Sequence, residues 1–322
     1  MAWGERSMRV SVVLTAYNGA TVIGRQMDSI RLQTVSPDEV LICDDCSTDD
    51  TRDIVAGYIT RYSLSGWQLI KNESNLGWKR NFMEGIRRST GDIIFLADQD
   101  DRWLPEKLEV MLAVMVNRPE ILLLSCDMKI LYGENAIRAK HYAGTRRERS
   151  ERVTRYGFTR HFFMNPRPGC SYAFRSSFFD DVQALWQPSY PHDEFLWLMA
   201  ALQDGAFFYN DILMEFCRGA DNASDIRFKD IPMQRENLAY ILAMLETMER
   251  YALACPERVP PDHLEKVRTA KVWCRKRMKI METRNPFRWL ALAPYWGYYN
   301  SFQNCLSDPY LVLFGSFRRR AR

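Results

Sequence analysis

Short apolar strands alternate with helices along the first 130 residues, and this alternation constrains the fold more than any other feature of the sequence. Runs of β-branched and apolar residues predict strands over residues 9–16, 39–44, 67–71, 92–96 and 121–131. Apolar residues at helical spacing predict helices over residues 23–32, 50–62, 79–88 and 105–117. Ser47 or Thr48 is expected to cap the second helix, and Pro105 to open the fourth. Strands separated by helices of this length predict a parallel sheet with helices on both faces.

The rest of the chain shows a weaker strand pattern and ends in helices. Residues 138–160 hold eight Lys and Arg residues and predict an irregular excursion. Helices are expected over 176–186 and 193–202, followed by a hairpin-like pair of short strands over 206–209 and 212–216. Helical spacing then returns over 233–251 and 261–282. The pattern predicts an α/β domain with a helical C-terminal extension.

Composition and cysteine content narrow the class of protein. Hydrophobic residues make up 47% of the 322 residues and charged residues 26%, which excludes a disordered or low-complexity chain. No stretch reaches the ~18–20 apolar residues of a transmembrane helix, and the first residues do not resemble a signal peptide. The eight cysteines are irregularly spaced, and Cys43 and Cys46 lack the second pair of a structural zinc site. We therefore expect reduced thiols and a cytoplasmic protein.

Carboxylates gather where two of the predicted strands end. Asp44 and Asp45 follow the second strand, and Asp98, Asp100 and Asp101 follow the fourth. Because ligands bind at the carboxyl ends of strands in such sheets, both groups are expected to face one crevice. Clustered carboxylates repel one another unless a cation is present, and Mg²⁺ or Mn²⁺ shared with substrate phosphates suits few oxygen ligands. The alternative is a solvated acidic turn before the next helix.

Six motifs occur in a characteristic order along the chain. They are VVLTAYNG at 12–19, LICDDCSTDDT at 41–51, NLGWKRNF at 75–82, GDIIFLADQDDRW at 91–103, GCSYAFR at 169–175 and HDEFLW at 192–197. Together they resemble family-2 glycosyltransferases with the GT-A fold, and the DQDD form resembles a subgroup with many rhamnosyltransferases of bacterial surface polysaccharides. The resemblance implies a catalytic domain over 8–225, with a mostly parallel central sheet flanked by helices, and a helical basic extension over 226–322.

The same resemblance implies an inverting transfer of a sugar from a nucleoside diphosphate sugar to a glycan or a lipid-linked acceptor. The donor would be dTDP-rhamnose or a UDP-sugar. Thr15 and Tyr17 would line the nucleotide base pocket, unless Tyr17 is an ordinary aromatic residue at a strand end. Asp45 would accept a hydrogen bond from the pyrimidine N3–H, which favours uracil or thymine over cytosine. Asp44 would shape the turn, and Cys46 stands where the family usually has Gly.

The resemblance also indicates which residues would bind the phosphates of the donor. Lys79 or Arg80 would face the phosphates or the sugar, the alternative being two cations on a helix surface. Asp98 and Asp100 would form the DxD unit and are the candidate metal ligands, Asp100 for the cation itself and Asp98 also for ribose or sugar. Mn²⁺ or Mg²⁺ would stabilise the charge that grows on the departing diphosphate.

Asp193 is the candidate catalytic base that takes the proton of the acceptor hydroxyl. It precedes a predicted helix, where the helix dipole favours its charged form, and the alternative is a simple N-cap. Glu194 is the rival base. His192 is expected to be a local hydrogen-bonding residue and not a metal ligand.

One departure from the family affects the metal site. Relatives often carry a Tyr-Arg-x-His segment after the last strand, but residues 216–224 read FCRGADNAS and contain no His. Arg218 or Asp221 would then bind the diphosphate or the metal. The missing His also supports an alternative, a catalytically weak or inactive GT-A protein that acts as a membrane-associated partner in polysaccharide assembly. A nucleotidyltransferase is disfavoured, because the first strand is not followed by a glycine-rich phosphate loop.

The C-terminal segment has a clear excess of basic over acidic residues. Residues 262–322 hold thirteen Lys and Arg against four Asp and Glu, although the whole chain has a net charge of only +4. The cations lie among tryptophans and tyrosines, which predicts either peripheral contact with an anionic membrane surface or a solvated face of packed helices. No nucleic-acid-binding motif accompanies the charge, so a nucleic-acid partner is not expected.

Overall fold

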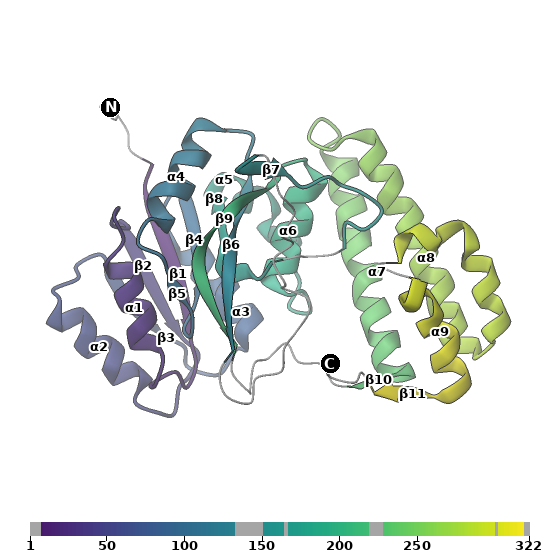
Figure 1. The fold of residues 1–322 in the computed structure, drawn as a ribbon, viewed down its shortest axis with the longest axis horizontal. Coiled ribbons are helices and arrows are strands. Elements are labelled where there is room, and N and C mark those ends of the chain that lie inside the picture. The colour runs from purple at the N-terminus through teal and green to yellow at the C-terminus, as the bar shows by residue number, and fades with distance from the viewer. Residues whose placement is uncertain (1–7, 133–150, 164–166, 219–227, 300–301, 319–322) are drawn as a thin grey trace.

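The computed structural model describes residues 8–132, 151–163, 167–218, 228–299 and 302–318 (Figure 1). Its strands are β1 (Val10–Ala16), β2 (Glu39–Asp44), β3 (Trp67–Lys71), β4 (Ile93–Asp98), β5 (Arg102–Trp103), β6 (Leu123–Tyr132), β7 (Val153–Arg155), β8 (Tyr172–Arg175), β9 (Ala206–Arg218), β10 (Phe228–Asp230) and β11 (Ser316–Arg318). Its α-helices are α1 (Ile23–Arg31), α2 (Thr51–Arg61), α3 (Trp78–Arg88), α4 (Lys107–Asn117), α5 (Ser176–Val182), α6 (His192–Leu202), α7 (Ile231–Ala254), α8 (Pro261–Thr283) and α9 (Phe302–Phe314). Three 3₁₀-helices are η2 (Gly169–Ser171), η3 (Gln183–Leu185) and η4 (Pro286–Tyr298).

A nine-stranded sheet forms the centre of the larger, amino-terminal part, in the order β3-β2-β1-β4-β8-β6-β9-β5 with β7 beside β9. The pairings among β3, β2, β1 and β4 are parallel, as is that of β6 with β9. β8 runs antiparallel to β4 and β6, and β5 and β7 run antiparallel to β9. The predicted α/β class is therefore confirmed, and the sheet is mixed because short return strands enter its middle and edge.

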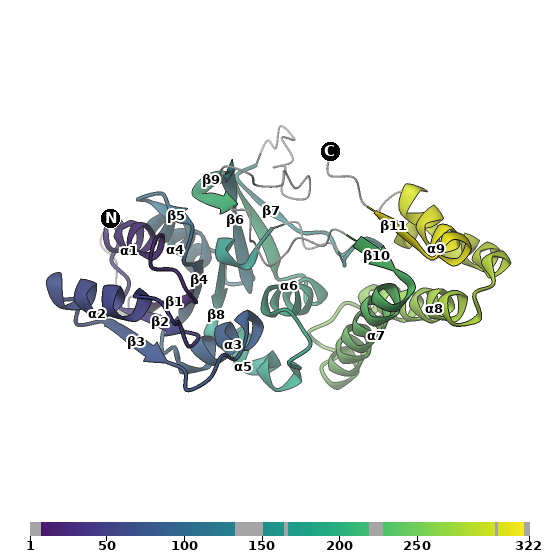
Figure 2. The same ribbon diagram turned by 90° about the horizontal axis from the view of Figure 1, so that it is seen from below.

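The two faces of the sheet bury different side chains, as the period of two in a strand requires. On one face, Val12 and Leu14 of β1 pack with residues of α1, α2 and α4. On the other face, Val13 of β1 packs with residues of α3 and α6, in a cluster that continues into α7 and α8 (Figure 2). The core thus runs without a break from the sheet into the helical C-terminal region.

The predicted hairpin over 206–216 is wrong, because β9 is one continuous strand parallel to β6. Asn210 and Asp211 have the polar character of a turn, but they form an irregularity where the register to β6 shifts. The predicted irregular excursion over 138–160 also contains a short strand, β7. Residues 133–150 lie outside the described residues.

Two predictions about helix N-termini are also wrong, namely the cap of α2 and the place of Pro105 in α4. α2 begins at Thr51, and neither Ser47 nor Thr48 caps it; both instead bind the loop after β1, Ser47 Oγ accepting from Asn18 N and Thr48 N donating to Asn18 Oδ1. α4 begins at Lys107, so Pro105 lies just outside it. Ser47 and Thr48 therefore bind the β1 loop and not the start of α2.

Most of the basic residues of α8 are paired with acidic residues. Glu249 of α7 accepts from Arg268 Nε at 3.0 Å and from Lys271 Nζ, and Glu246 accepts from Arg275. Arg277 is buried and forms a two-pronged ion pair with Asp308 of α9, at 2.6 and 2.9 Å. Much of the charge of the C-terminal segment therefore joins its helices together. No helix among the described residues is long and apolar enough to cross a membrane.

Candidate active site

The ends of the predicted parallel strands meet at one edge of the sheet. In the strand register, Thr15 of β1 lies beside Cys43 of β2 on one side and beside Asp98 of β4 on the other. The loops after these strands therefore begin at the same level, as the sequence predicts. Thr15 is buried at this edge.

Asp45 organises the loop that precedes α3. Its buried carboxylate accepts hydrogen bonds from the backbone N–H groups of Leu76 at 2.7 Å and Gly77 at 2.9 Å, and from the Asn72 amide at 3.0 Å. A carboxylate offers about four lone-pair sites, so one stays available for a base N–H. The role of Asp45 in base recognition stays a prediction, and the structure adds a local role in holding residues 72–77.

The turn after β2 is shaped by Asp44, as predicted. The Asp44 carboxylate is fully buried and accepts hydrogen bonds from Ser47 N at 3.1 Å and from Arg52 Nε. Cys46 between them has a φ of 64°, a left-handed conformation that glycine adopts most easily. The preference of the family for Gly at this position thus has a backbone cause, and this chain keeps the turn with a cysteine.

Gln99, in the middle of the DQDD motif, ties the β4 loop to the β1 loop. Its Oε1 accepts from Tyr17 N at 2.9 Å, and its Nε2 donates to Tyr17 O at 3.0 Å. The Tyr17 backbone is therefore fixed, while the residue as a whole is 48% exposed. An exposed ring on a fixed backbone can stack on a planar base.

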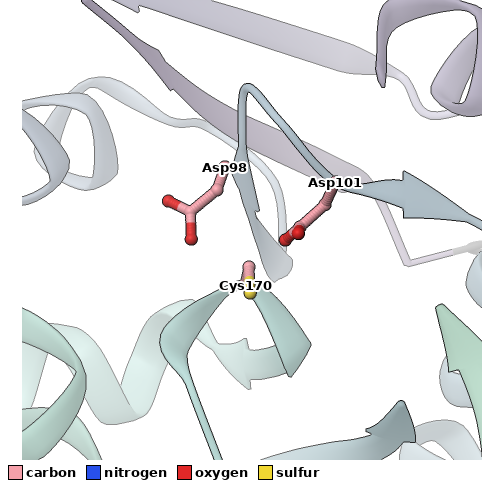
Figure 3. A group of neighbouring side chains, drawn as sticks. All are labelled: Asp98, Asp101 and Cys170. Carbon is pink, nitrogen blue, oxygen red and sulfur yellow. The ribbon is translucent and has the colours of Figure 1, made fainter. Parts of the chain in front are cut away.

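The acidic residues after β4 converge with a cysteine of η2 (Figure 3). One ligand atom each from Asp98, Asp101 and Cys170 lies within 4.8 Å of the others. Burial, and next the charge of Asp100, raise the pKa of Asp98 to about 7. Burial also raises the pKa of Asp100, and raises that of Asp101 well above its usual range. The predicted pair was Asp98 and Asp100, whereas the converging trio contains Asp101 instead.

This donor set fits a divalent cation. Asp101 Oδ1 accepts from Cys217 N at 3.0 Å, but its Oδ2 is buried with no N–H or O–H donor among the described residues. Carboxylate oxygens are the ligands that Mg²⁺ and Mn²⁺ prefer. The Cys170 sulfur is a softer group, and burial raises its pKa, which keeps it a thiol. The carboxylates, and not the sulfur, suit these ions.

A buried lysine lies beneath the acidic cluster. Lys107, at the start of α4, is fully buried and donates from Nζ to the Cys170 carbonyl at 2.9 Å, with its charge 3.9 Å from the centre of the Trp103 ring. Burial lowers the pKa of Lys107, whereas the charges of Asp101 and Asp98 raise it. The cation and the acids thus offset part of the cost of each other's burial.

Two arginines act on the acidic cluster and a lysine acts on Asp193, whereas Arg80 faces its own helix. Arg25 of α1 donates to the Asp100 carbonyl at 2.6 Å, and the charges of Arg25 and Arg218 lower the pKa of Asp100 against the effect of burial. Lys79 donates to the Ser189 carbonyl at 2.9 Å. Arg80 points toward Glu84 on the same helix, 3.9 Å away. Asp221 lies outside the described residues.

Asp193 lies in the first turn of α6 and is not its N-cap, which is Pro191. Burial raises the pKa of Asp193, while hydrogen bonds from backbone N–H groups lower it. The space beside it depends on Gly169 of η2, because a Cβ there would lie 2.9 Å from Asp193 Cβ. The charge of Asp193 in turn raises the pKa of Asp98. The base candidate and the acidic cluster therefore belong to one site, with η2 between them.

Glu194, the rival base, is engaged by the C-terminal region. Tyr240 of α7 donates its hydroxyl to Glu194 Oε2, and burial followed by the charge of Asp193 raises the pKa of Glu194. The charge of Lys79 lowers the pKa of both Asp193 and Glu194, against the effect of burial. One oxygen of each carboxylate is engaged, Glu194 Oε2 by the Tyr240 hydroxyl and Asp193 Oδ1 by Glu194 N at 2.9 Å, so the choice between the two as base stays a prediction.

His192 is not the local hydrogen-bonding residue that the sequence predicts. Its ring stacks on Phe82, with 4.0 Å between ring centres, and meets the edge of Trp78 at 5.6 Å. Neither ring nitrogen has a hydrogen-bond partner among the described residues, and burial lowers the pKa of His192 to about 3. The residue is a neutral packing group that supports the start of α6.

The sequence did not single out several residues that the structure places at the site. Gln99 belongs to the DQDD motif and could have been found there, and Asp101 was placed in the acidic cluster but not among the metal ligands. Lys107 is the one basic residue in the mostly apolar sequence of α4, which is a weak signal. Arg25 and Tyr240 lie 75 and 46 residues from their partners, and no pattern links them.

A family model described as Glycosyl transferase family 2 matches residues 11–181, more than half of the chain. An uncharacterized glycosyltransferase of Nostoc is 35% identical over 109 residues, 33% of each chain. The UDP-Glc:alpha-D-GlcNAc-diphosphoundecaprenol beta-1,3-glucosyltransferase WfgD of Escherichia coli is 32% identical over 107 residues, 33% of this chain and 41% of WfgD. The putative teichuronic acid biosynthesis glycosyltransferase TuaG of Bacillus subtilis is 33% identical over 109 residues, 34% of this chain and 42% of TuaG. These matches span from a third to about two fifths of the relatives' length.

Among solved structures, residues 1–349 of S. aureus TarS in complex with UDP-GlcNAc resemble the whole chain. The TM-score is 0.59 at 16% identity, covering 97% of this chain and 93% of that one. The same fragment with UDP gives a TM-score of 0.57. At this identity the likeness shows the fold, and it includes the helical C-terminal region.

Proposed function

Because the chain belongs to glycosyl transferase family 2, we propose that it transfers a sugar, with inversion at the anomeric carbon, from a nucleoside diphosphate sugar to an acceptor hydroxyl. The observation that carries the proposal is the juxtaposition, across η2, of the acidic cluster after β4 with Asp193 of α6. One group suits the phosphates of a donor, and the other suits the proton of an acceptor.

The nucleotide base would bind between Tyr17 and Asp45, above Thr15. The exposed Tyr17 ring offers a stacking surface, and Asp45 keeps an acceptor position for a pyrimidine N3–H. This chemistry favours a UDP- or dTDP-sugar. The names of WfgD and of the TarS complexes mention UDP-Glc and UDP-GlcNAc, which supports the uridine donors, and dTDP-rhamnose stays the other candidate.

The diphosphate would lie over the end of β4. Asp98 and Asp100, with Asp101 beside them, would hold Mn²⁺ or Mg²⁺. Such an ion supplies Lewis-acid stabilisation of the negative charge on the leaving nucleoside diphosphate. Arg218, Lys79 and Arg80 are the candidate cations of the chain itself for the phosphates, and Arg218 already acts on the charge of Asp100.

Asp193 would be the general base. As the acceptor oxygen forms its bond to the anomeric carbon, the bond from that carbon to the phosphate oxygen breaks, and its electron pair stays on the diphosphate. The acceptor proton passes to an Asp193 oxygen. The electropositive start of α6 and the nearby Lys79 favour the ionised form that this step needs.

The acceptor would be a glycan or a lipid-linked sugar in the assembly of a bacterial polysaccharide, as the names of WfgD and TuaG suggest for those relatives. Transfer to a lipid-linked acceptor would take place at a membrane surface. The irregularly spaced cysteines of the sequence support a reducing compartment, so we place the reaction in the cytoplasm, at the inner face of the plasma membrane.

Calorimetry with UDP-glucose, UDP-GlcNAc and dTDP-rhamnose, with and without Mn²⁺, tests the donor. Asp193→Asn should bind the preferred donor as the wild type does and lose at least about 10²-fold in turnover, the usual contribution of a general base. Asp180→Asn, an exposed carboxylate of α5, is the matched control. Full turnover in Asp193→Asn would refute the base assignment, and Glu194→Gln would then test the rival. Binding without turnover in the wild type would favour the inactive alternative.

A further inference from the structure

The outward face of α9 is apolar, contrary to the usual pattern of a surface helix. Four exposed side chains lie at positions i, i+4, i+7 and i+8 of this helix: Leu306, Tyr310, Leu313 and Phe314. The opposite face holds Asp308 and Leu311, which are fully buried. The apolar outward face is thus not the face with which α9 packs on the protein.

The preceding 3₁₀-helix, η4, presents two further apolar side chains. Phe287 is 80% exposed and Leu290 is 63% exposed, while Leu313 and Phe314 on α9 are 62% and 66% exposed. These are the four most exposed large apolar side chains among the described residues, and all four lie in the last 36 residues. Single exposed apolar residues are common, but such a concentration marks an interaction site.

η4 and α9 pack against each other, so their exposed residues belong to one surface region. Trp289 Nε1 donates to the Cys305 carbonyl at 2.8 Å, and the Tyr310 and Phe314 rings are in contact, with centres 4.7 Å apart. Both elements lie beyond α8, at the end of the molecule remote from β3 (Figures 1 and 2). The ion pair of Arg277 with Asp308 fixes α9 to α8.

Exposed cations border this region. They lie on the last turns of α8, at its end and on η4: Arg275, Lys279, Arg284 and Arg288. Of the acidic residues of the same segments, Asp308 is buried in its ion pair and Glu282 lies 3.4 Å from Lys279. Arg275 is paired in turn with Glu246 of α7, so among the described residues the excess positive charge of this border comes from Arg284 and Arg288.

We propose that η4 and α9 form a docking face for an anionic lipid bilayer, with Phe287, Leu290, Leu313 and Phe314 inserted at the headgroup level. Apolar side chains surrounded by cations are typical of proteins that lie on a membrane surface. A second copy of the chain fits less well, because its own positive border would face this one. This docking face rests on the membrane contact proposed above and supplies its residues. Helix α7, whose Tyr240 donates to Glu194 of α6, belongs to the same helical region.

Vesicle co-sedimentation of the full chain tests the proposal without any donor or acceptor. The probes are phosphatidylcholine vesicles with and without phosphatidylglycerol, at low and high salt. The wild type should bind the anionic vesicles, and high salt should weaken the binding. Leu313→Glu/Phe314→Glu should weaken it at least about tenfold, and Arg288→Glu should weaken it more at low salt than at high salt.

Leu253→Glu is the matched control, because Leu253 is an equally large and 57% exposed side chain on α7. It should leave vesicle binding unchanged. Equal loss in the control and in the double variant, or no wild-type binding, would overturn the docking face. Light scattering after size exclusion adds a second check: a wild-type dimer that Leu313→Glu/Phe314→Glu converts to a monomer, without vesicle binding, would overturn it in favour of self-association. Donor hydrolysis measured in solution separates these outcomes from failure of the proposed enzyme activity, since none of these residues is at the active site.

Discussion

Replacing Lys107 by Met should destabilise the protein strongly, although it keeps most of the packing of the side chain. The change removes a hydrogen bond from a charged donor to the Cys170 carbonyl, and such bonds contribute about 1.5–3 kcal/mol. It also leaves Asp98 and Asp101 without the buried cation whose charge acts on them. This effect acts over a longer separation than a direct ion pair, so its cost stays below the about 3–5 kcal/mol of breaking such a buried pair. Because the two costs overlap, we expect a loss of about 3–4 kcal/mol in the free energy of unfolding.

Urea denaturation in the presence of a chelator measures this loss without interference from bound metal. Lys129→Met is the control, because Lys129 is a surface residue 3.7 Å from Glu215, and its loss should cost less than about 1 kcal/mol. The cause is tested by repeating Lys107→Met in an Asp101→Asn background. If Lys107 acts by offsetting the acids, it should cost about 1–3 kcal/mol less there. An equal cost in both backgrounds would refute the reasoning and leave the Cys170 hydrogen bond as the whole effect.

Three further predictions concern the base, its surroundings and the extension. Gly169→Ala should lower turnover at least about tenfold while calorimetry shows nucleotide binding retained. The added Cβ would lie 2.9 Å from Asp193 Cβ and would displace the proposed base. Gly57→Ala is the control, because open space surrounds Gly57. The pH profile of kcat/KM should have an acid limb above pH 3.8, the usual pKa of Asp, because burial raises the pKa of Asp193. Activity should fall as the pH falls, since the proposed base then gains a proton. A profile without that limb would contradict the assignment. Arg277→Met should cost about 3–5 kcal/mol in urea denaturation because it leaves Asp308 buried without its partner, and Arg277→Met/Asp308→Leu should cost less than the sum of the two single changes.

Local patterns predicted most of the strands and helices before β6, because each of these elements is specified by the residues within it. The bounds of β2 and β3 agree with the prediction, and the strand-end position of the acidic residues followed from the parallel order of β1, β2 and β4. The prediction failed where tertiary pairing decides the outcome. Asn210 and Asp211 read as a turn, but the pairing of β9 with β6 on both sides of them keeps the strand continuous.

At the site, the motifs identified the residue types that carry charge, but not the neighbours that set their environment. Asp98 and Asp193 could be chosen from the sequence, whereas the effect of burial on their pKa could not, since burial depends on η2 and α4. His192 shows the same limit. A histidine beside a candidate base suggests hydrogen bonding, yet its stacking on Phe82 makes it an apolar packing group.

The contact of Tyr240 with Glu194 bears on how the chain is organised. The family model ends at residue 181, and the sequence places a domain boundary at 225/226, so the extension reads as a separate unit. In the structure, α7 continues the apolar cluster that contains α6, and its Tyr240 hydroxyl donates to Glu194, the carboxylate next to Asp193. Removing the extension would expose that cluster and free Glu194 at once. The helical region is therefore a structural part of the site, and a docking face on α9 would be connected to the acceptor side through α8 and α7.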